Sequence, residues 1–382
     1  MNWKEKKLSF LKRSKTILIK IGSAVLTTEK GDINKEIIFN LVEDISFLKK
    51  ELNKNIILVS SGAVASGWKF LKKEKSLLSL TEKQAAAAVG QIRLMHIYEE
   101  AFLNHGIVIA QILLTKDDLR NRNRFLNAKN TFMVLLKNKV IPIVNENDSV
   151  AIDELKFGDN DFLASLLLNL IQADLFINLT TAKGVFDKNP IRDKHAKKFD
   201  YIEDIDGLDL LSICDGKTDV GTGGMYSKLL AAKRAAQLGV PTFILPGKEK
   251  SVLKKAFSGE DIGTWIAPNK RPISQKKFWL AYNLTPCGEV IIDQGAKDAL
   301  VIKNKSLLPA GVLDVKGNFE SGSLIKIIDE KSNQIGVGIT NFSSEEIKKI
   351  KGLKTCEIEK QLKRKIKNPE IIHIDNLIIG EF

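Results

Sequence analysis

Short apolar runs alternate with longer amphipathic segments along residues 1–268. Runs of β-branched and aliphatic residues predict buried strands at residues 16–19, 56–59, 107–113, 140–144, 175–179 and 241–245. Helical periodicity predicts helices at residues 35–52, 82–104, 127–137, 162–171 and 225–238, and Gly239 is expected to end the last one. Strands that alternate with helices form a mostly parallel sheet with helices on both faces. The pattern therefore predicts an α/β fold, a three-layer sandwich.

The pattern changes after Pro268, where charged residues lie between two prolines. Shorter apolar runs, separated by glycines, then predict strands at residues 290–292, 299–302, 324–328 and 335–339. Short strands with glycine turns are typical of a small β-barrel. A chain of 382 residues also favours two domains. We expect an α/β domain over residues 1–268 and a β-barrel over residues 269–382.

Short polar clusters, most of which contain glycine, lie mainly where the predicted strands end. They occupy residues 20–23, 60–63, 145–148, 158–161, 180–184 and 221–225. Because the carboxyl ends of parallel strands share one edge of a sheet, we expect these clusters to converge. Glycines let backbone N–H groups approach phosphate oxygens, and Lys20, Lys183 and Lys228 supply positive charge. Any one cluster could be an ordinary turn or helix cap, but together they predict a phosphate-handling site.

The net charge of +13 raises the alternative of a nucleic-acid-binding protein. Only nine of the 59 basic residues are arginine, the residue that planar, bidentate recognition of phosphates and bases favours. A solvated, lysine-rich surface is the favoured interpretation.

Cysteine and histidine chemistry is not indicated. The three cysteines are far apart, and the four histidines show neither metal-ligand nor catalytic-triad spacing. The chain has no apolar run of about eighteen residues, and its lysine-rich start lacks the apolar stretch of a signal peptide. We therefore expect a cytoplasmic protein without a membrane segment.

The nucleotide motifs of other folds are absent, since the chain has neither a Walker loop nor a G-x-G-x-x-G after a strand. In chain order, however, it carries K-I-G-S, S-S-G-A, N-E-N-D, G-D-N-D and G-T-G-G-M-x-x-K. This series resembles the amino acid kinase superfamily. Residues 87–94 and 124–128 are similar to the members that act on L-glutamate rather than on acetylglutamate, uridylate or aspartate. Residues 288–296 and 306–312 resemble a PUA domain.

The resemblance implies that the chain phosphorylates the side-chain carboxylate of L-glutamate with ATP, giving L-glutamyl 5-phosphate in the first step of proline synthesis. A carboxylate acceptor is already ionised at pH 7, so such a site needs lysines to neutralise charge and no general base. The resemblance further implies Mg²⁺, although no ligand set can be assigned. It also suggests a homo-oligomer, either a dimer or a tetramer.

Site residues carry over motif by motif. The implied catalytic residues are two lysines and an aspartate, Lys20, Lys228 and Asp161. The implied glutamate-binding residues are Ser61, Gly62, Ala63, Asn145, Asp148 and Asn160. The implied nucleotide-binding residues are Lys20, Gly22, Ser23, Thr180, Thr181, Lys183, Thr222, Gly223, Gly224, Met225 and Lys228. The chain departs from the family pattern at Thr181, where an aspartate is usual, and at Ala24, where a hydroxyl is usual.

Two alternatives stay open. One is an RNA-binding protein on a degenerate kinase scaffold, which the intact lysines and Asp161 disfavour. The other is a kinase for a different small acid such as acetylglutamate, which residues 145–148 disfavour. RNA binding by the C-terminal domain is the less favoured role for that domain, because no aromatic stacking platform stands out.

Overall fold

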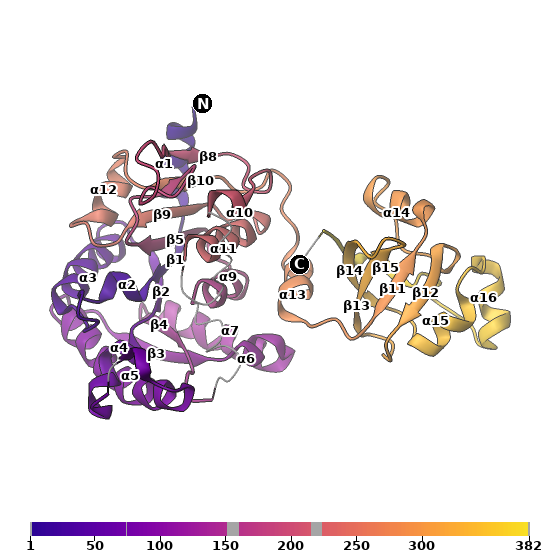
Figure 1. The fold of residues 1–382 in the computed structure, drawn as a ribbon, viewed down its shortest axis with the longest axis horizontal. Helices are drawn as coiled ribbons and strands as arrows, with labels where there is room; N and C mark the ends of the chain where they lie inside the picture. The colour runs from indigo at the N-terminus through magenta and orange to yellow at the C-terminus, as the bar shows by residue number, and fades with distance from the viewer. Residues whose placement is uncertain (1, 74, 151–159, 215–223, 381–382) are drawn as a thin grey trace. The chain divides into compact units, whose positions relative to one another are not determined.

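An eight-stranded sheet runs through residues 1–272 of the computed structural model, which describes residues 2–73, 75–150, 160–214 and 224–380 (Figure 1). Its strand order is β3-β4-β2-β1-β5-β9-β10-β8, and every pairing except the antiparallel β9–β10 is parallel. The strands are β1 (Thr16–Ile21), β2 (Asn55–Ser60), β3 (Ile109–Leu114), β4 (Ile141–Glu146), β5 (Leu175–Thr180), β8 (Tyr201–Ile202), β9 (Thr242–Pro246) and β10 (Thr264–Ile266). A separate hairpin pairs β6 (Val185–Phe186) with β7 (Lys198–Phe199).

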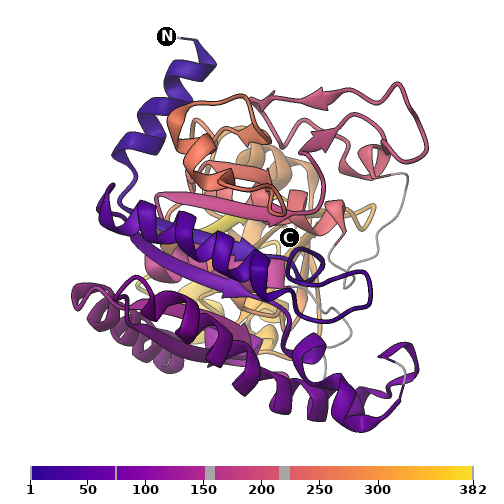
Figure 2. The same ribbon diagram turned by 90° about the vertical axis from the view of Figure 1, so that its left-hand side faces the viewer.

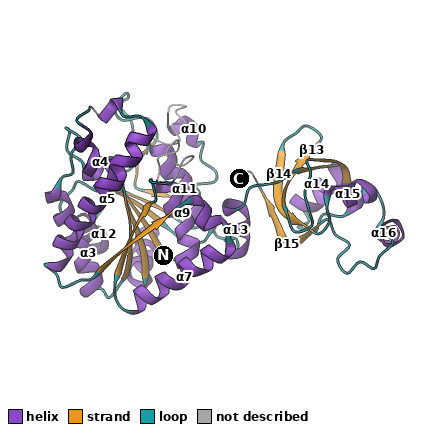
Figure 3. Ribbon diagram, turned by 90° about the horizontal axis from the view of Figure 1, so that it is seen from below, coloured by secondary structure: helices purple, strands orange, loops and turns teal. Residues whose placement is uncertain are grey.

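Helices cover both faces of this sheet, so the predicted three-layer sandwich is confirmed (Figures 1 and 3). One layer holds α1 (Trp3–Arg13), α3 (Lys35–Lys50), α5 (Leu80–Leu103) and α12 (Val252–Ser258), and Figure 2 looks onto α3 and α5. The opposite layer holds α7 (Arg122–Lys137), α9 (Asn160–Ile171) and α11 (Met225–Gln237). Short helices in the connections are α2 (Ser23–Leu26), α4 (Ala63–Gly67), α6 (Lys116–Arg120) and α10 (Leu210–Ile213).

Local sequence explains several helix ends. Ser79 and Glu82 form a capping box at the start of α5, in which each side chain bonds the other's backbone N–H. Gly239 follows α11 with φ +78°, the left-handed conformation that glycine adopts without strain, so its predicted role as a helix stop is confirmed.

Two glycines set the distance between α4 and α5. A Cβ atom on Gly90 would lie 1.8 Å from the carbonyl oxygen of Ala63, and one on Gly67 would lie 2.0 Å from that of Ala86. The two helix backbones therefore touch, because neither position carries a side chain.

The second unit, residues 273–382, contains a five-stranded sheet in the order β12-β11-β13-β14-β15. Its strands are β11 (Glu289–Ile292), β12 (Val312–Lys316), β13 (Leu324–Asp329), β14 (Gln334–Thr340) and β15 (Ile372–Ile379). Its helices are α13 (Gln275–Asn283), α14 (Gln294–Val301), α15 (Ser344–Ile350) and α16 (Thr355–Leu362). Along the sequence, the chain divides into its two compact units between Pro272 and Ile273, and the expected boundary at residue 268 stays a prediction.

The strand predicted at residues 299–302 is wrong, because this apolar run ends helix α14. Asp293 caps that helix by accepting the N–H of Ala296 at 2.6 Å. Leu300 is buried on the inner side of the helix, whereas Val301 and Ile302 are 50% and 75% exposed. A single buried position in this run fits a helical rather than a strand period. Across the described ranges, no helix has both the length and the apolar character to span a membrane.

Candidate active site

Asp161 lies at the centre of a buried charge cluster. Its Oδ1 is 2.6 Å from the Nζ atom of Lys20, and its Oδ2 is 3.2 Å from the Nζ atom of Lys228. The amide of Asn178 also donates to Oδ1, at 2.7 Å, and the hydroxyl of Ser227 donates to Oδ2, at 3.2 Å. Asp161 is fully buried, and the two lysines are 2% and 4% exposed. Among the described residues, two ammonium groups against one carboxylate leave one positive charge in this cluster.

Strand alternation positions two of these side chains. Lys20 in β1 pairs in register with Asn178 in β5, so both lie on the same face of the sheet. Neighbours of Lys20 such as Ile19 and Ile21 belong to the core on the opposite face. Lys20 and Asn178 therefore point towards the layer of α9 and α11, where Asp161 occupies the first turn of α9 and Lys228 that of α11.

A chain of side-chain amides lies beside this cluster. Nδ2 of Asn160 is 2.9 Å from Oδ1 of Asn145, 3.0 Å from the hydroxyl of Ser61 and 3.3 Å from the carbonyl oxygen of Ser60. Asn145 in turn donates to the side chain of Gln91 at 2.9 Å. These bonds join the ends of β2 and β4 to the start of α9.

Asp148 lies in a cavity next to these amides. The cavity has a volume of about 180 Å³ and is bordered by α5, β3 and residues 146–149 at the end of β4. Gln91 lines this cavity and also bonds Asn145, so the cavity and the amide chain are contiguous.

The turn after β2 requires a glycine, whereas the backbone conformation of the turn after β1 does not. Gly62 has φ +113°, a conformation that other residues rarely adopt, and it precedes the buried Ala63 at the start of α4. Gly22 has φ −71° and donates its N–H to the carbonyl oxygen of Leu179 at 3.2 Å, while Ser23 begins α2. In this conformation the N–H of Gly22 is therefore used within the protein, although the sequence suggested it as a phosphate donor.

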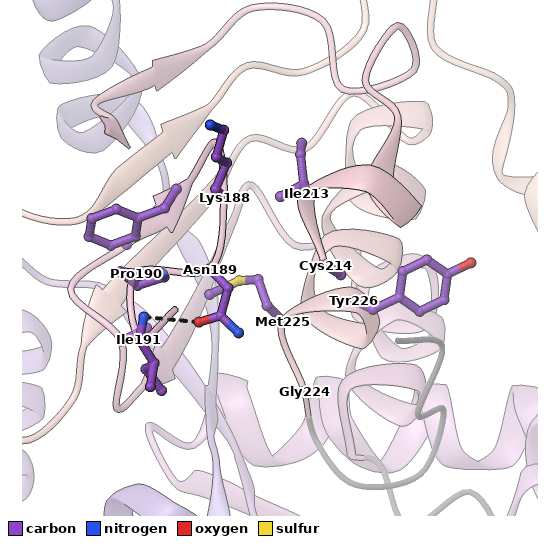
Figure 4. Close-up of a pocket in the computed structure, with 12 residues that line it drawn as sticks. Lys188, Asn189, Pro190, Ile191, Ile213, Cys214, Gly224, Met225 and Tyr226 are labelled. Carbon is purple, nitrogen blue, oxygen red and sulfur yellow. Dashed lines mark hydrogen bonds between the residues drawn. The ribbon is translucent and has the colours of Figure 1, made fainter. Parts of the chain in front are cut away.

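A second cavity, with a volume of about 280 Å³, lies at the start of α11 (Figure 4). Its walls come from the loop after β5, the segment after β6, α10 and the start of α11. They include Gly184, Asn189, Cys214, Gly224 and Met225. Oδ1 of Asn189 accepts the N–H of Ile191 at 3.0 Å, the bond drawn in Figure 4. Lys228 bonds the carbonyl oxygen of Gly224 at 3.3 Å, which connects this cavity to Asp161.

The remaining residues that were expected to bind the nucleotide differ in how exposed they are. Thr180 is buried at the end of β5, whereas Thr181 and Lys183 are exposed in the loop that follows. Gly224 and Met225 line the cavity, but Thr222 and Gly223 lie outside the described residues.

Sequence analysis missed three residues of this site: Asn178, Ser227 and Gln91. Asn178 leaves a detectable signal, because it is a polar residue within the apolar run Leu-Phe-Ile-Asn-Leu. Ser227 directly precedes Lys228 and looks like any polar position at a helix start. Gln91 lies in a stretch that matched the family pattern, yet nothing in its spacing indicates a contact with Asn145.

The described side chains of the site do not form a metal-binding group. Among the residues that the structure describes, no group of three histidine, cysteine, aspartate or glutamate side chains could hold a metal ion. Both oxygens of Asp161 already accept bonds from lysine and neutral donors. A divalent ion would therefore fit here only when substrate oxygens supply most of its ligands.

Family models match both units of the chain. Residues 15–246 match the model described as amino acid kinase family, and residues 288–362 match the PUA domain model. A buried pair of lysines around one aspartate, at the carboxyl edge of a parallel sheet, thus occurs in an amino acid kinase domain, and a PUA domain follows it. Among solved structures, UMP kinase from Bacillus anthracis is 17% identical, with a TM-score of 0.47, over 66% of this chain and 96% of that one.

Curated relatives extend over nearly the whole chain. The protein named glutamate 5-kinase from Maridesulfovibrio salexigens is 52% identical over 373 residues, which cover 98% of each chain. Its namesake from Nitratidesulfovibrio vulgaris is 52% identical over 379 residues, 99% of each chain, and that from Oleidesulfovibrio alaskensis is 49% identical. The chain therefore belongs to the glutamate 5-kinase family.

Proposed function

We propose that this protein transfers the terminal phosphoryl group of ATP to the side-chain carboxylate of L-glutamate, forming L-glutamyl 5-phosphate and ADP. The reaction is the first step of proline biosynthesis. The observation that carries this proposal is the buried cluster of Lys20, Asp161 and Lys228, which hydrogen bonds and neighbouring residues link to two cavities. One cavity adjoins the amide chain and the other adjoins the start of α11, so two anionic substrates can meet at the lysines.

The lysines neutralise the charge of the transferring phosphoryl group. The acceptor carboxylate and the γ-phosphate repel each other, and a cluster with one net positive charge offsets this repulsion where water is excluded. Asp161 holds both ammonium groups on its two oxygens and so fixes their separation. No general base takes part, because the attacking carboxylate is already ionised. Catalysis then consists of orientation and electrostatic stabilisation.

Glutamate is assigned to the amide side of the site. Ser61, Asn145 and Asn160 form one hydrogen-bonded group, which we propose orients the substrate together with the turn at Gly62 and Ala63. Asp148 lines the adjoining cavity, where its carboxylate would bind the α-ammonium group of glutamate. Burial also raises the pKa of Tyr98, whose hydroxyl bonds Ser60 at 2.8 Å at this end of β2.

ATP is assigned to the other side of the site. The cavity between residues 182–191 and the start of α11 would hold the base and ribose, with Gly224 and Met225 in its wall. The free N–H groups at the start of α11 favour phosphate oxygens. Lys228 would act on the phosphates from this side and Lys20 from the opposite side. The remaining expected contacts are Gly22, Ser23, Thr180, Thr181, Lys183, Thr222 and Gly223.

We further propose that Mg²⁺ enters with the nucleotide, because phosphate oxygens and water can supply the ligands that the described side chains lack. Bound there, it would add positive charge at the phosphates. We propose the cytoplasm as the compartment, since the three cysteines are free thiols.

The two domains and the assembly state also belong to the proposal. Residues 1–268 would form the kinase domain and residues 269–382 the PUA-like domain. A homodimer or tetramer is proposed because β3 ends the sheet and the nearby helices expose Ile92 and Val134. RNA binding by the PUA domain is not favoured.

The test is trapping of the product. Purified protein with magnesium-ATP and hydroxylamine should form a γ-hydroxamate with L-glutamate, and little with acetylglutamate, aspartate or no acceptor. Lys228→Ala should abolish this product while the protein stays folded by circular dichroism. Folded wild-type protein without glutamate-dependent hydroxamate would refute the proposal.

A further inference from the structure

Asn178 is an exception within its strand. All six residues of β5 are buried, and Asn178 is 0% exposed between Ile177 and Leu179. A buried amide destabilises the fold unless its polar atoms form hydrogen bonds. Such an exception to local rules is often retained for function.

Only one end of this amide has a described partner. Nδ2 donates to Oδ1 of Asp161 at 2.7 Å, the oxygen that also accepts Lys20. Oδ1 of Asn178 is buried and has no hydrogen-bond partner in the parts of the chain that the structure describes. A leucine, of similar branched shape, would remove this unsatisfied oxygen. Leucine would also remove the hydrogen bond to the ionised Asp161, so the exchange trades one unsatisfied oxygen for one lost donor and carries only a modest cost in stability.

We propose that Asn178 is a positioning residue that holds the carboxylate of Asp161 in the orientation in which it aims Lys20 at the phosphoryl group. The inference rests on the proposed function. An ionised carboxylate has about four acceptor positions, and four donors from the described residues contact the two oxygens. Asn178 contributes one of them without adding charge, so it fixes the carboxylate while the cluster keeps its positive charge for the substrates.

Without Asn178, one hydrogen-bond donor fewer holds Oδ1 of Asp161 in place beside Lys20. The carboxylate can then rotate about its Cβ–Cγ bond, and the ammonium group of Lys20, already in contact with Oδ1 at 2.6 Å, turns with it away from the transferring group. A misplacement of about 1 Å can cost about 10²-fold in rate. Glutamate binding should change little, because none of the described contacts of Asn178 reaches Ser61, Asn145 or Asn160.

Three variants test the role, each in the full-length protein. Asn178→Leu removes the donor, and Asn178→Asp replaces it by an acceptor of the same shape. Thr242→Val is the matched control, because the hydroxyl of Thr242 is also buried and without a described partner, on the neighbouring strand β9. For each variant, kcat, the KM values for glutamate and ATP, and the Tm are measured from pH 6 to pH 8.5.

Asn178→Leu should lower kcat roughly 10- to 100-fold. Its KM for glutamate should stay within about twofold of wild type, and its Tm should fall by only a few degrees, because Asp161 keeps its other described donors. Asn178→Asp should be slow at pH 8 and recover several-fold as the pH falls, because a protonated carboxyl group again donates to Asp161. Asn178→Leu should show no such recovery. Thr242→Val should match wild type throughout.

The outcomes separate the two claims. If wild type and Thr242→Val form glutamyl hydroxamate and Asn178→Leu is equally fast, the positioning role is wrong while the proposed function stands. A lower Tm with an unchanged kcat for the folded fraction would also overturn it, since Asn178 would then only stabilise the strand. If the wild type itself forms no hydroxamate, the proposed function fails and the positioning role fails with it.

Discussion

Replacing Gly90 by alanine tests how the helix crossing controls the glutamate side of the site. The added Cβ would lie 1.8 Å from the carbonyl oxygen of Ala63 and 2.6 Å from the backbone nitrogen of Gly67, whereas ordinary contacts begin near 3.4 Å. Both neighbours are backbone atoms, which cannot rotate away. Helices α4 and α5 must therefore separate by about 1.6 Å at this point, if the whole overlap is relieved along that contact.

The expected change in stability has the opposite sign to the change that helix propensity predicts. Glycine to alanine inside a helix normally stabilises it by about 1 kcal/mol. Overpacking of this kind costs about 1–3 kcal/mol, so we expect a net loss of stability that lowers Tm by about 2–4 °C for each kcal/mol. Because α4 begins at Ala63, directly after Ser61 and Gly62, its displacement should also reduce kcat/KM for glutamate about 10- to 100-fold.

The assay combines urea unfolding with glutamate-dependent hydroxamate formation. Ala85→Gly is the matched control, since Ala85 is exposed on the same helix and the change lowers helix propensity without touching the crossing. It should cost about 1 kcal/mol of stability and leave kcat/KM unchanged. A Gly90→Ala protein that is more stable than wild type and fully active would refute the reasoning.

Three further changes probe the kinase unit. Burial raises the pKa of Asp44, which caps α12 by accepting the N–H of Leu253, above its ordinary 3.8. The stability that this raised pKa contributes is therefore complete below about pH 3.8 and is lost as the pH rises through the pKa of Asp44 in the folded protein. Asp44→Asn should therefore resist urea better than wild type at pH 7 but not at pH 4. Lys54→Met should cost about 2–3 kcal/mol in urea unfolding and speed amide exchange in α1, because Lys54 donates to three backbone carbonyl oxygens at the end of that helix; unchanged exchange would contradict this. Phe162→Leu should cost about 1 kcal/mol and Phe162→Tyr almost nothing, because Lys116 and Arg234 lie 4.7 and 4.5 Å from the ring centroid; equal losses would rule out a cation–π contribution.

Sequence reasoning located the elements of the kinase unit well because buried parallel strands are nearly continuous apolar runs. The run at residues 175–179, for example, became β5 with a shift of one residue at its end. The same rule failed at residues 299–302, where β-branched residues follow a strong helix cap at Asp293. Helix α1 was not predicted, because one of its two buried positions is a lysine, Lys7, so the segment does not show an apolar period.

The polar residues at strand ends could also be identified from the sequence, but most of their hydrogen-bond partners could not. The sequence singled out Asp161, Lys20 and Lys228 through motifs, and only the family resemblance implied that the aspartate holds both lysines in place, as the structure shows. Asn178 was passed over because a single polar residue in a strand has many explanations until its neighbours are known.

The strands of the large sheet, the glycine turns after them and the lysines and amides at their ends could all be predicted from the order of residues. These features depend on local conformational preference and on burial period, which act over a few residues. Which of these groups meet depends on the packing of distant segments. Asp161 and Lys228 are 67 residues apart, and they contact because α9 and α11 begin side by side above the pair of Lys20 and Asn178. Contacts of this kind follow from packing and strand register, which no local pattern records.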